Sequence, residues 1–236
     1  MTDPNEDRHR IQSYGRKRGR PLRAERRKLF DELLPTIEIA PAPPAALDLA
    51  ALWGGRDRPT WLEIGFGAGE HLAWQAARHP EIGFIGAEVY DAGIGVLLSA
   101  IARERLDNIR ICHDDAVSLL EALPDASIAR AFVLFPDPWP KRRHWKRRFV
   151  SEEGLARLAR VLADGAELRL ATDDPSYLVW MLQHILASPD FDWSPRAARD
   201  WLERPEDWPQ TRYEAKAIRE GRRPSYLSLT RRARQI

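Results

Sequence analysis

The alternation of short apolar runs with longer helical patterns is the feature that most constrains the fold of this chain. It begins at Thr60. Strands are expected at residues 60–64, 83–87, 108–112, 129–135 and 167–171. Helices are expected at residues 69–79, 92–105, 116–122, 152–162 and 176–186. A repeated strand–helix–strand order with crossovers of this length predicts an α/β fold, in which a mostly parallel sheet carries helices on both faces.

The first 45 residues differ in character from the rest of the chain. Residues 1–29 are polar and basic with a weak helical pattern, and a short helical turn is expected at residues 29–34. Prolines at positions 35, 41, 43 and 44 then interrupt any regular element. Because 236 residues suit one domain with a tail, we expect a basic, flexible N-terminal arm at residues 1–45 and a single domain at residues 46–236.

Composition excludes several classes of protein. The longest nearly apolar run, residues 92–102, is shorter than the roughly 18 residues that a membrane-spanning helix needs. The basic N-terminus lacks the apolar stretch of a secretory signal. Cys112 is the single cysteine, so neither an intramolecular disulfide nor a cysteine-ligated metal cluster is expected. These observations predict a cytoplasmic protein with no membrane span and no metal site.

The net charge of +2 conceals three strongly basic segments. Residues 8–28 carry a net charge of +9, residues 141–148 carry +6, and residues 211–236 carry +6. The rest of the chain is therefore strongly acidic. One such run is usually only a solvated face, but three separated runs favour a polyanionic partner whose phosphates are contacted at several points.

The first expected strand ends in a glycine-rich run. Its sequence from residue 62 is Leu-Glu-Ile-Gly-Phe-Gly-Ala-Gly, with glycines at Gly65, Gly67 and Gly69. Glycine permits a tight turn and a close approach of the backbone to a ligand. Glu70 stands where a dinucleotide-binding fingerprint has its last glycine, and Glu63 adds an acid which that fingerprint does not require. The run resembles the acidic Gly-x-Gly-x-Gly loop of class I methyltransferases, although a purely structural turn can also carry such glycines.

Acidic residues follow the next two expected strands. Glu88 comes directly after residues 83–87, where a carboxylate can accept hydrogen bonds from ribose hydroxyls. An exposed acid at a strand end is the structural alternative, which its register with the glycine-rich run disfavours. Asp114 and Asp115 follow the third strand. An acid here can accept from an adenine amino group, cap the next helix, or do both, and the doubled aspartate leaves the assignment open.

The loop after the fourth expected strand is the most specific stretch of the sequence. It reads Pro-Asp-Pro-Trp-Pro from residue 136 and continues into the basic run at residues 141–148. The prolines restrict the backbone, so Asp137 should be held rigidly at the end of a central strand. Trp139 beside Lys and Arg residues is typical of stacking on bases and contact with phosphates.

Four motifs together resemble one family. Phe-Pro-Asp-Pro-Trp-Pro-Lys-Arg-Arg-His from residue 135, the run from residue 62, Ala-Thr-Asp from residue 171 and Thr-Arg-Tyr-Glu-Ala-Lys from residue 211 are similar to bacterial tRNA (guanine-N7)-methyltransferases. The resemblance implies a class I methyltransferase (Rossmann-like) fold, S-adenosylmethionine as cofactor and tRNA as partner. It implies methyl transfer to N7 of a variable-loop guanine, guanine 46, by a monomer or a homodimer.

The resemblance also implies roles for individual residues. The implied catalytic residue is Asp137. The implied cofactor contacts are Glu63, Gly65, Gly67, Gly69, Glu88, Asp115 and Asp137. The implied substrate contacts are Lys141, Asp173, Thr211, Arg212, Tyr213 and Glu214. The implied RNA contacts are Arg143, His144, Trp145, Lys146, Arg147 and Arg148. The chain departs from many members of the family at Tyr213, where they have Phe, and at Asp174, where they have Trp.

The expected reaction makes modest chemical demands. Guanine N7 carries a lone pair and no proton, so its methylation needs no general base. The protein must align the base and stabilise it as it becomes cationic, and the Asp137 carboxylate suits both tasks.

Two other functions are compatible with parts of the sequence. The spacing of the glycine-rich run disfavours a NAD-dependent oxidoreductase, and the acids matched to it disfavour a tRNA-binding module without catalysis.

Overall fold

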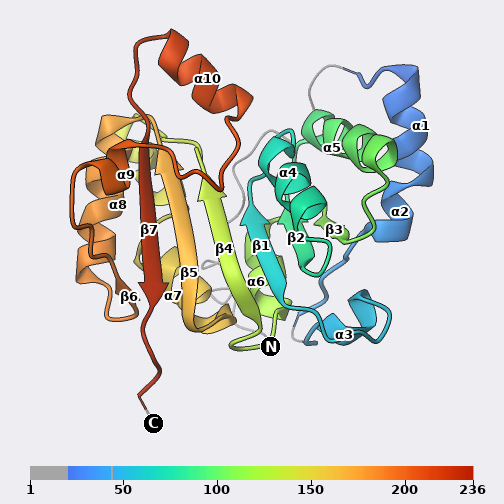
Figure 1. Ribbon diagram of the computed structural model, residues 1–236, viewed down its shortest axis with the longest axis horizontal. Helices are drawn as coiled ribbons and strands as arrows, with labels where there is room; N and C mark the ends of the chain where they lie inside the picture. The colour runs from blue at the N-terminus through green and yellow to red at the C-terminus, as the bar shows by residue number, and fades with distance from the viewer. Residues whose placement is uncertain (1–20, 44, 236) are drawn as a thin grey trace, which may run out of the picture.

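The computed structural model describes residues 21–43 and 45–235, and a seven-stranded sheet lies at its centre (Figure 1). Its order is β3-β2-β1-β4-β5-β7-β6. The strands are β1 Thr60–Ile64, β2 Gly83–Ala87, β3 Ile109–Cys112, β4 Ile128–Leu134, β5 Leu162–Thr172, β6 Phe191–Asp192 and β7 Ser225–Arg231. Strands β1 to β5 are parallel, whereas β7 is antiparallel to both β5 and β6. The predicted mostly parallel sheet is therefore confirmed.

Helices cover both faces of the sheet, as the alternating pattern predicts. The helices that follow the first five strands are α4 Glu70–Arg78, α5 Asp91–Glu104, α6 Ala116–Ala122, α7 Glu152–Val161 and α8 Pro175–Ala187. Helices α4 and α5 lie in front of β1 to β3 in Figure 1, and α6 and α7 lie behind the sheet. Further helices are α3 Leu49–Leu52, α9 Arg199–Leu202 and α10 Arg212–Arg219. In the described part of the chain, no helix is long and apolar enough to cross a membrane.

The register of the parallel strands aligns their carboxyl ends. Ile64 at the end of β1 lies opposite Ala87 at the end of β2 and opposite Val133 near the end of β4. In the same way, Ala87 lies opposite Cys112, the last residue of β3. The loops after β1, β2, β3 and β4 consequently meet at one edge of the sheet, where ligands of open α/β sheets bind. Helix α10 lies above this edge (Figure 1).

Part of the segment expected to be a flexible arm is packed against the domain. Residues 1–20 lie outside the described residues, but α1 Ala24–Glu32 and α2 Leu34–Ile37 follow them. Helix α1 packs along α5, and the buried Leu34 joins the apolar cluster on that side of the sheet. The backbone N–H of Ile39 donates to the carbonyl of Ile111 in β3, at 2.8 Å. Leu29, Phe30 and Leu33 are partly buried against the same apolar cluster, which holds α1 against α5.

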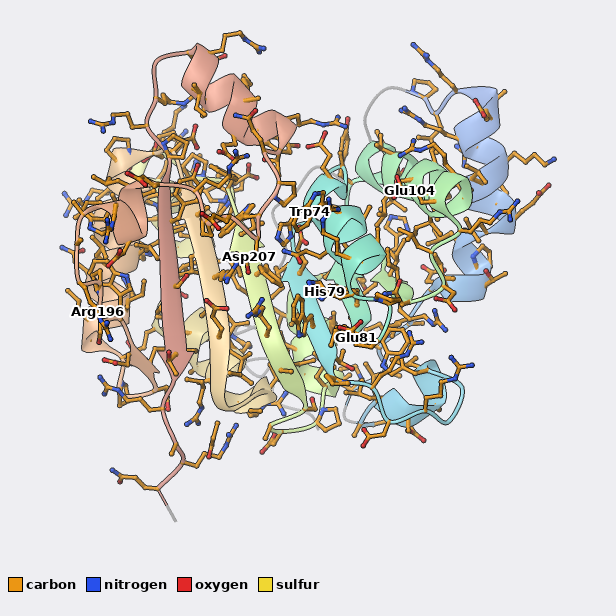
Figure 2. All side chains as sticks on the ribbon, viewed as in Figure 1. Trp74, His79, Glu81, Glu104, Arg196 and Asp207 are labelled. Carbon is orange, nitrogen blue, oxygen red and sulfur yellow. The ribbon has the colours of Figure 1, made fainter. Side chains whose placement is uncertain are left out.

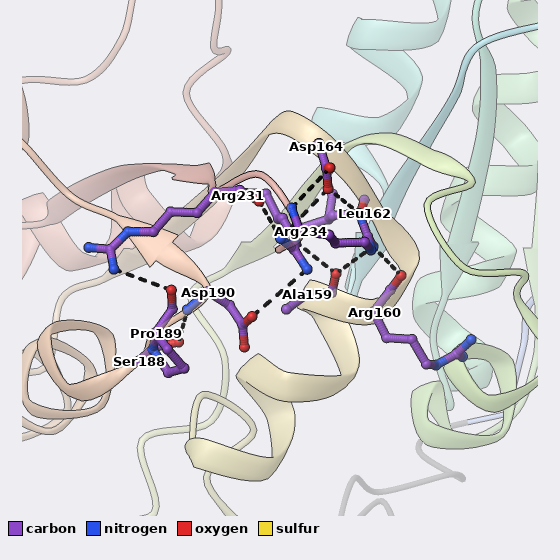
Figure 3. A network of polar contacts seen from close by, with 10 residues as sticks. Ala159, Arg160, Leu162, Asp164, Ser188, Pro189, Asp190, Arg231 and Arg234 are labelled. Carbon is purple, nitrogen blue, oxygen red and sulfur yellow. Dashed lines mark hydrogen bonds and ion pairs between the residues drawn. The ribbon is translucent and has the colours of Figure 1, made fainter. Parts of the chain in front are cut away.

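Two arginines of the C-terminal basic segment lie inside a polar network instead of facing a partner. Figure 3 shows Arg231 and Arg234 beside the end of α7 and the start of β5. The buried Arg231 donates through Nε to the carbonyl of Ala159, at 3.1 Å. The Arg234 guanidinium donates to the carbonyls of Ala159, Arg160 and Leu162, at 3.1, 2.8 and 2.9 Å. These charges stabilise the C-terminal end of the fold, so they do not add to a phosphate-binding surface.

Candidate active site

A cavity of about 390 Å³ lies at the carboxyl edge of the parallel strands. Its wall is built from the loops that follow β1, β2, β3 and β4, together with residues at the start of α10. Seven of the residues that the sequence marks as candidates for cofactor binding lie in this wall: Glu63, Gly65, Gly67, Glu88, Asp114, Asp115 and Asp137. Gly69 is the N-cap of α4 and lies just behind the wall. The fold therefore brings together loops that are separated by more than twenty residues in the sequence.

The glycines after β1 have backbone conformations that other residues rarely adopt. Gly65, Gly67 and Gly69 have φ angles of +69°, +59° and +72°. A Cβ atom on Gly67 would lie 2.9 Å from the Tyr213 ring, and one on Gly69 would lie 2.7 Å from Leu97. The three glycines thus let the loop turn tightly beneath Tyr213 and against α5.

The Glu88 carboxylate fastens the loop after β2 to the loop after β1. Its Oε2 accepts a hydrogen bond from the Gly67 N–H at 2.8 Å. Its Oε1 accepts from the N–H groups of Val89 and Tyr90, at 2.8 and 3.0 Å. Burial raises the pKa of Glu88, while these N–H donors oppose that shift. Glu88 lines the cavity, and its Oε2 can accept one further hydrogen bond, from a ligand.

The two aspartates after β3 make different local contacts. Asp115 is the N-cap of α6, where its Oδ1 accepts from the Val117 N–H at 2.9 Å. Asp114 Oδ1 accepts from the Asp115 N–H at 2.8 Å. Both side chains also line the cavity. The expected helix-capping role of Asp115 is therefore confirmed, and it is compatible with a second contact to a ligand.

Asp137 lies in a strained loop at the end of β4. The residues Phe135 and Trp139 on either side have φ angles of +51° and +45°, in the left-handed region that non-glycine residues seldom occupy. Such conformations cost of order 1–3 kcal/mol each and concentrate at functional sites. The Asp137 side chain reaches solvent through the cavity, but the surrounding wall removes part of its water and raises its pKa.

The residues expected to contact substrate divide into three groups. Thr211 and Tyr213 line the cavity, and Thr211 is also the N-cap of α10, accepting from the Glu214 N–H at 3.3 Å. Arg212, Asp173 and Glu214 make contacts within the protein. Arg212 Nε lies 2.8 Å from Glu70 Oε1, Asp173 accepts from Arg222 Nε at 2.6 Å, and the buried Glu214 accepts from the Tyr226 hydroxyl at 2.7 Å. Lys141 is exposed and lies outside the cavity wall.

Comparison with known proteins places this site in a family. A family model described as "Putative methyltransferase" matches residues 57–226. The chain is 50% identical to the tRNA (guanine-N(7)-)-methyltransferase of Rhodospirillum rubrum over 98% of this chain and 91% of that protein. It is 48% identical to the tRNA (guanine-N(7)-)-methyltransferase of Brucella anthropi over 93% of this chain and 94% of that protein. The chain belongs to the tRNA (guanine-N7)-methyltransferase family.

The structural comparison agrees with this assignment at the level of the fold. An rRNA methylase from Streptococcus thermophilus superposes with a TM-score of 0.51 and 12% sequence identity. The match covers 75% of this chain and 89% of the other. At this identity the likeness concerns the fold alone, which is that of class I methyltransferases. Among the described residues, no cluster of His, Cys, Asp or Glu is arranged to hold a metal ion.

The basic run of this methyltransferase forms a short 3₁₀ helix, η2 Arg142–Arg147. Arg143 and Lys146 are exposed, and the Arg147 guanidinium lies 4.9 Å from the Trp139 ring centre. The side chains of His144 and Trp145 are half-buried. Partial desolvation and neighbouring positive charges lower the pKa of His144. The exposed part of the run thus lies next to the loop that carries Asp137.

Arg148 differs from the expectation that the whole run faces RNA. Its side chain is buried, with a relative exposure of 2%. Nε donates to the Pro138 carbonyl at 2.8 Å, and one terminal nitrogen donates to the Ser176 hydroxyl at 3.0 Å. The guanidinium carbon lies 4.9 Å from the ring centres of Trp145 and Tyr177. Arg148 therefore stabilises the Asp137 loop from inside the protein, where it is not accessible to a phosphate.

Several residues of the methyltransferase site have no clear signal in the sequence. His71, Tyr90 and Phe149 line the cavity, and Glu70 reaches it while it contacts Arg212. Glu70 and Arg212 are separated by 142 positions, so local patterns cannot reveal their pairing. The aromatic residues resemble ordinary core positions. In the sequence, only Glu63, two residues before the first glycine of the run, indicates a functional role for this part of the cavity wall.

Proposed function

We propose that this methyltransferase transfers a methyl group from S-adenosylmethionine to N7 of guanine 46 in the variable loop of tRNA. The observation that carries the proposal is the placement of Glu88, Asp137 and Tyr213 around one cavity. Glu88 is the residue expected to bind the nucleoside of the cofactor, and Asp137 and Tyr213 are expected to contact the guanine base. The names of the relatives that are about 50% identical support methylation of tRNA at guanine N7, and the position 46 is part of the proposal.

The cavity has the size and the donor set that this cofactor needs. Its volume of about 390 Å³ lies within the usual range for small-molecule sites. Gly67 has no side chain at the point where a Cβ atom would lie 2.9 Å from the Tyr213 ring. The free acceptor capacity of Glu88 suits a ribose hydroxyl, and Asp114 or Asp115 suits the adenine amino group. When bound, the cofactor supplies an electrophilic methyl group on its sulfonium.

The protein's part in the reaction is to orient the base and stabilise positive charge. Guanine N7 attacks with a lone pair that carries no proton, so no side chain has to act as a general base. The Asp137 carboxylate accepts hydrogen bonds from guanine N1–H and the 2-amino group, and these bonds strengthen as the base becomes cationic. The strained and proline-rich loop keeps Asp137 in place for this contact. Asp173, which follows β5, and Glu214, on α10, lie outside the cavity wall and accept from Arg222 and Tyr226, so they hold the surrounding segments in place instead of contacting the base.

The tRNA is bound through its phosphates and through exposed aromatic side chains. Arg143, Lys146 and Arg147 provide positive charge next to the cavity, and phosphate contacts of this kind set the position of a nucleic acid. The 51% exposed Tyr213 and the half-buried Trp139 provide stacking surfaces for a guanine that has left its stack. Because the substrate is tRNA, the enzyme acts in the cytoplasm.

The direct test is a product analysis. Purified protein is incubated with labelled S-adenosylmethionine and a tRNA transcript, and the nucleosides are separated after digestion. A matched transcript has adenine in place of guanine 46. N7-methylguanosine should form in the first transcript and be absent from the second. Methylation of both transcripts would contradict the choice of position, and a product methylated on the 2-amino group would contradict the mechanism without a base.

A further inference from the structure

His71, on α4, is part of the cavity wall and packs against the segment that leads into α10. Its side chain is buried, with a relative exposure of 2%. Nδ1 lies 2.7 Å from Glu63 Oε2, and Nε2 lies 3.2 Å from Gln75 Nε2. The ring packs against Phe132 and Trp208, with ring centres 4.6 and 5.5 Å apart. A buried imidazole with two polar partners and two aromatic neighbours has little freedom to move.

The hydrogen bonds of this network determine which nitrogen of His71 carries the proton. Gln75 Nε2 donates to the backbone carbonyl of Asp207 at 2.8 Å. This contact sets the orientation of the amide, because the amide oxygen would repel a carbonyl oxygen at that distance. The same NH₂ group faces His71 Nε2, and an NH₂ group can only donate. His71 Nε2 is therefore the acceptor, so the proton lies on Nδ1, which donates to Glu63.

The network connects two parts of the site that are distant in the sequence. Glu63 lies at the end of β1, directly before the glycine-rich loop, and lines the cavity. Asp207 lies in front of the sheet beside α4, as Figure 2 shows, four residues before Thr211. Trp208 packs against both His71 and Tyr226, and the Tyr226 hydroxyl donates to Glu214. A single imidazole thus contacts the carboxylate at the cofactor end and the segment at the substrate end.

We infer that His71 is a positioning residue, whose neutral Nδ1–H tautomer orients the Glu63 carboxylate toward the cavity. The backbone carbonyl of Asp207 orients the Gln75 amide, and the donation of this amide to Nε2 favours the same tautomer as the acceptor-only carboxylate of Glu63 does. The inference rests on the proposed function in one respect, since it takes the ligand of the cavity to be S-adenosylmethionine.

Two substitutions at residue 71 separate the hydrogen bond from the packing. The amide nitrogen of Asn takes the position of Nδ1, and the amide nitrogen of Gln takes a position closer to that of Nε2. His71→Asn therefore keeps the donor to Glu63, whereas His71→Gln misplaces it. By calorimetry we expect His71→Gln to weaken S-adenosylmethionine binding about ten-fold or more and His71→Asn to stay within about three-fold of the wild type. His79→Gln, at the far end of α4, is the matched control.

A purely structural role for His71 gives a different result. Both substitutions remove the ring from between Phe132 and Trp208, so thermal unfolding should move by similar amounts in the two variants. Equal losses of cofactor affinity in Asn and Gln would overturn the proposal, as would wild-type affinity in both.

The tautomer can be measured without any cofactor, which separates this inference from the proposed function. In ¹⁵N NMR spectra of the wild-type protein, His71 should show a protonated Nδ1 and an unprotonated Nε2. Gln75→Met removes the donor to Nε2, and the Glu63 carboxylate, which can only accept, should keep the proton on Nδ1. A protonated Nε2 in the wild-type protein would overturn the inference. A correct tautomer in a protein that fails to bind S-adenosylmethionine would instead refute the proposed function.

Discussion

Glu88 Oε2 accepts a hydrogen bond from the backbone N–H of Gly67, at 2.8 Å. This contact joins the ends of β1 and β2, so Glu88 stabilises the glycine-rich loop even before any ligand binds. A residue expected from the sequence to bind a ribose thus has a second task. Substitution of Glu88 should therefore remove the contact to the ligand and also change the shape of the glycine-rich loop.

Glu88→Ala should weaken S-adenosylmethionine binding by roughly 1–3 kcal/mol, because it removes an acceptor for the ribose and releases the Gly67, Val89 and Tyr90 N–H groups. Calorimetric titration with the cofactor measures this loss. The affinity for tRNA should stay close to that of the wild type. Glu81→Ala, in the exposed turn after α4, serves as the control. An unchanged cofactor affinity in Glu88→Ala would remove this residue from the site.

Asp137→Ala and Asp137→Asn should each lower the single-turnover rate about 100-fold or more, while the protein stays folded and binds cofactor. Asn can still accept one hydrogen bond but carries no charge, so it separates charge stabilisation from orientation. Rapid-quench measurements with saturating tRNA and cofactor give the rate. A near-normal rate for Asp137→Asn would show that charge at this position contributes little to the reaction.

The raised pKa of Asp137 predicts opposite effects of pH on activity and on stability. The ionised form is the active one, so the rate should fall on acidification at a higher pH than for an ordinary aspartate. A carboxyl whose pKa is higher in the folded than in the unfolded state contributes stability below the unfolded pKa, and this contribution is lost as the pH rises through the folded pKa. Asp137→Asn should therefore unfold at a higher temperature than the wild type at neutral pH. In a series of thermal scans the difference should shrink toward acid pH, and a constant difference would contradict this explanation.

The basic run should contribute to tRNA binding unevenly. Replacing Arg143 and Lys146 by Gln should weaken binding and flatten its dependence on salt, by about one unit of slope for each phosphate that the variant no longer binds. The buried Arg148 contacts Pro138 and Ser176, so Arg148→Gln should leave the salt slope unchanged and lower turnover through the Asp137 loop. Titrations at several salt concentrations compare the variants. A flatter slope for Arg148→Gln would mean that this side chain reaches RNA.

The packed part of the N-terminal segment should contribute to stability. Leu34 is 3% exposed and belongs to the apolar cluster that includes residues of α4 and α5. Leu34→Ala should therefore lower the free energy of unfolding by about 2–5 kcal/mol in a denaturant titration. Leu186→Ala on α8, where the side chain is 69% exposed, should change it little. Equal effects in the two variants would show that α1 and α2 add nothing to the stability of the domain.

The helices and strands that the sequence predicted well are those with a regular local pattern. The bounds of β1, β2 and α6 agree with the expected ranges. Each is an apolar run or a regular helical pattern with a glycine or a helix-capping aspartate at one of its ends. The strand β7 was not expected. From Leu227 onward its residues alternate between buried and exposed positions, but they lie within a basic segment whose charge suggested a partner. A helical turn was expected at residues 29–34, whereas α1 begins earlier, at Ala24, because its apolar residues are few and its packing depends on α5.

The sequence by itself determined the architecture and the kinds of residue in the loops: a mostly parallel sheet, a glycine-rich turn, and acids after the second, third and fourth strands. These depend on local backbone preferences and on periodicity, which neighbouring residues carry. Only the tertiary structure decided which charges are available to a partner. Arg148, Arg231 and Arg234 are buried or bonded within the protein, and His71 is joined to Glu63 and Asp207. Such pairings depend on distances between residues far apart in the chain, so they form only when packing brings these residues together.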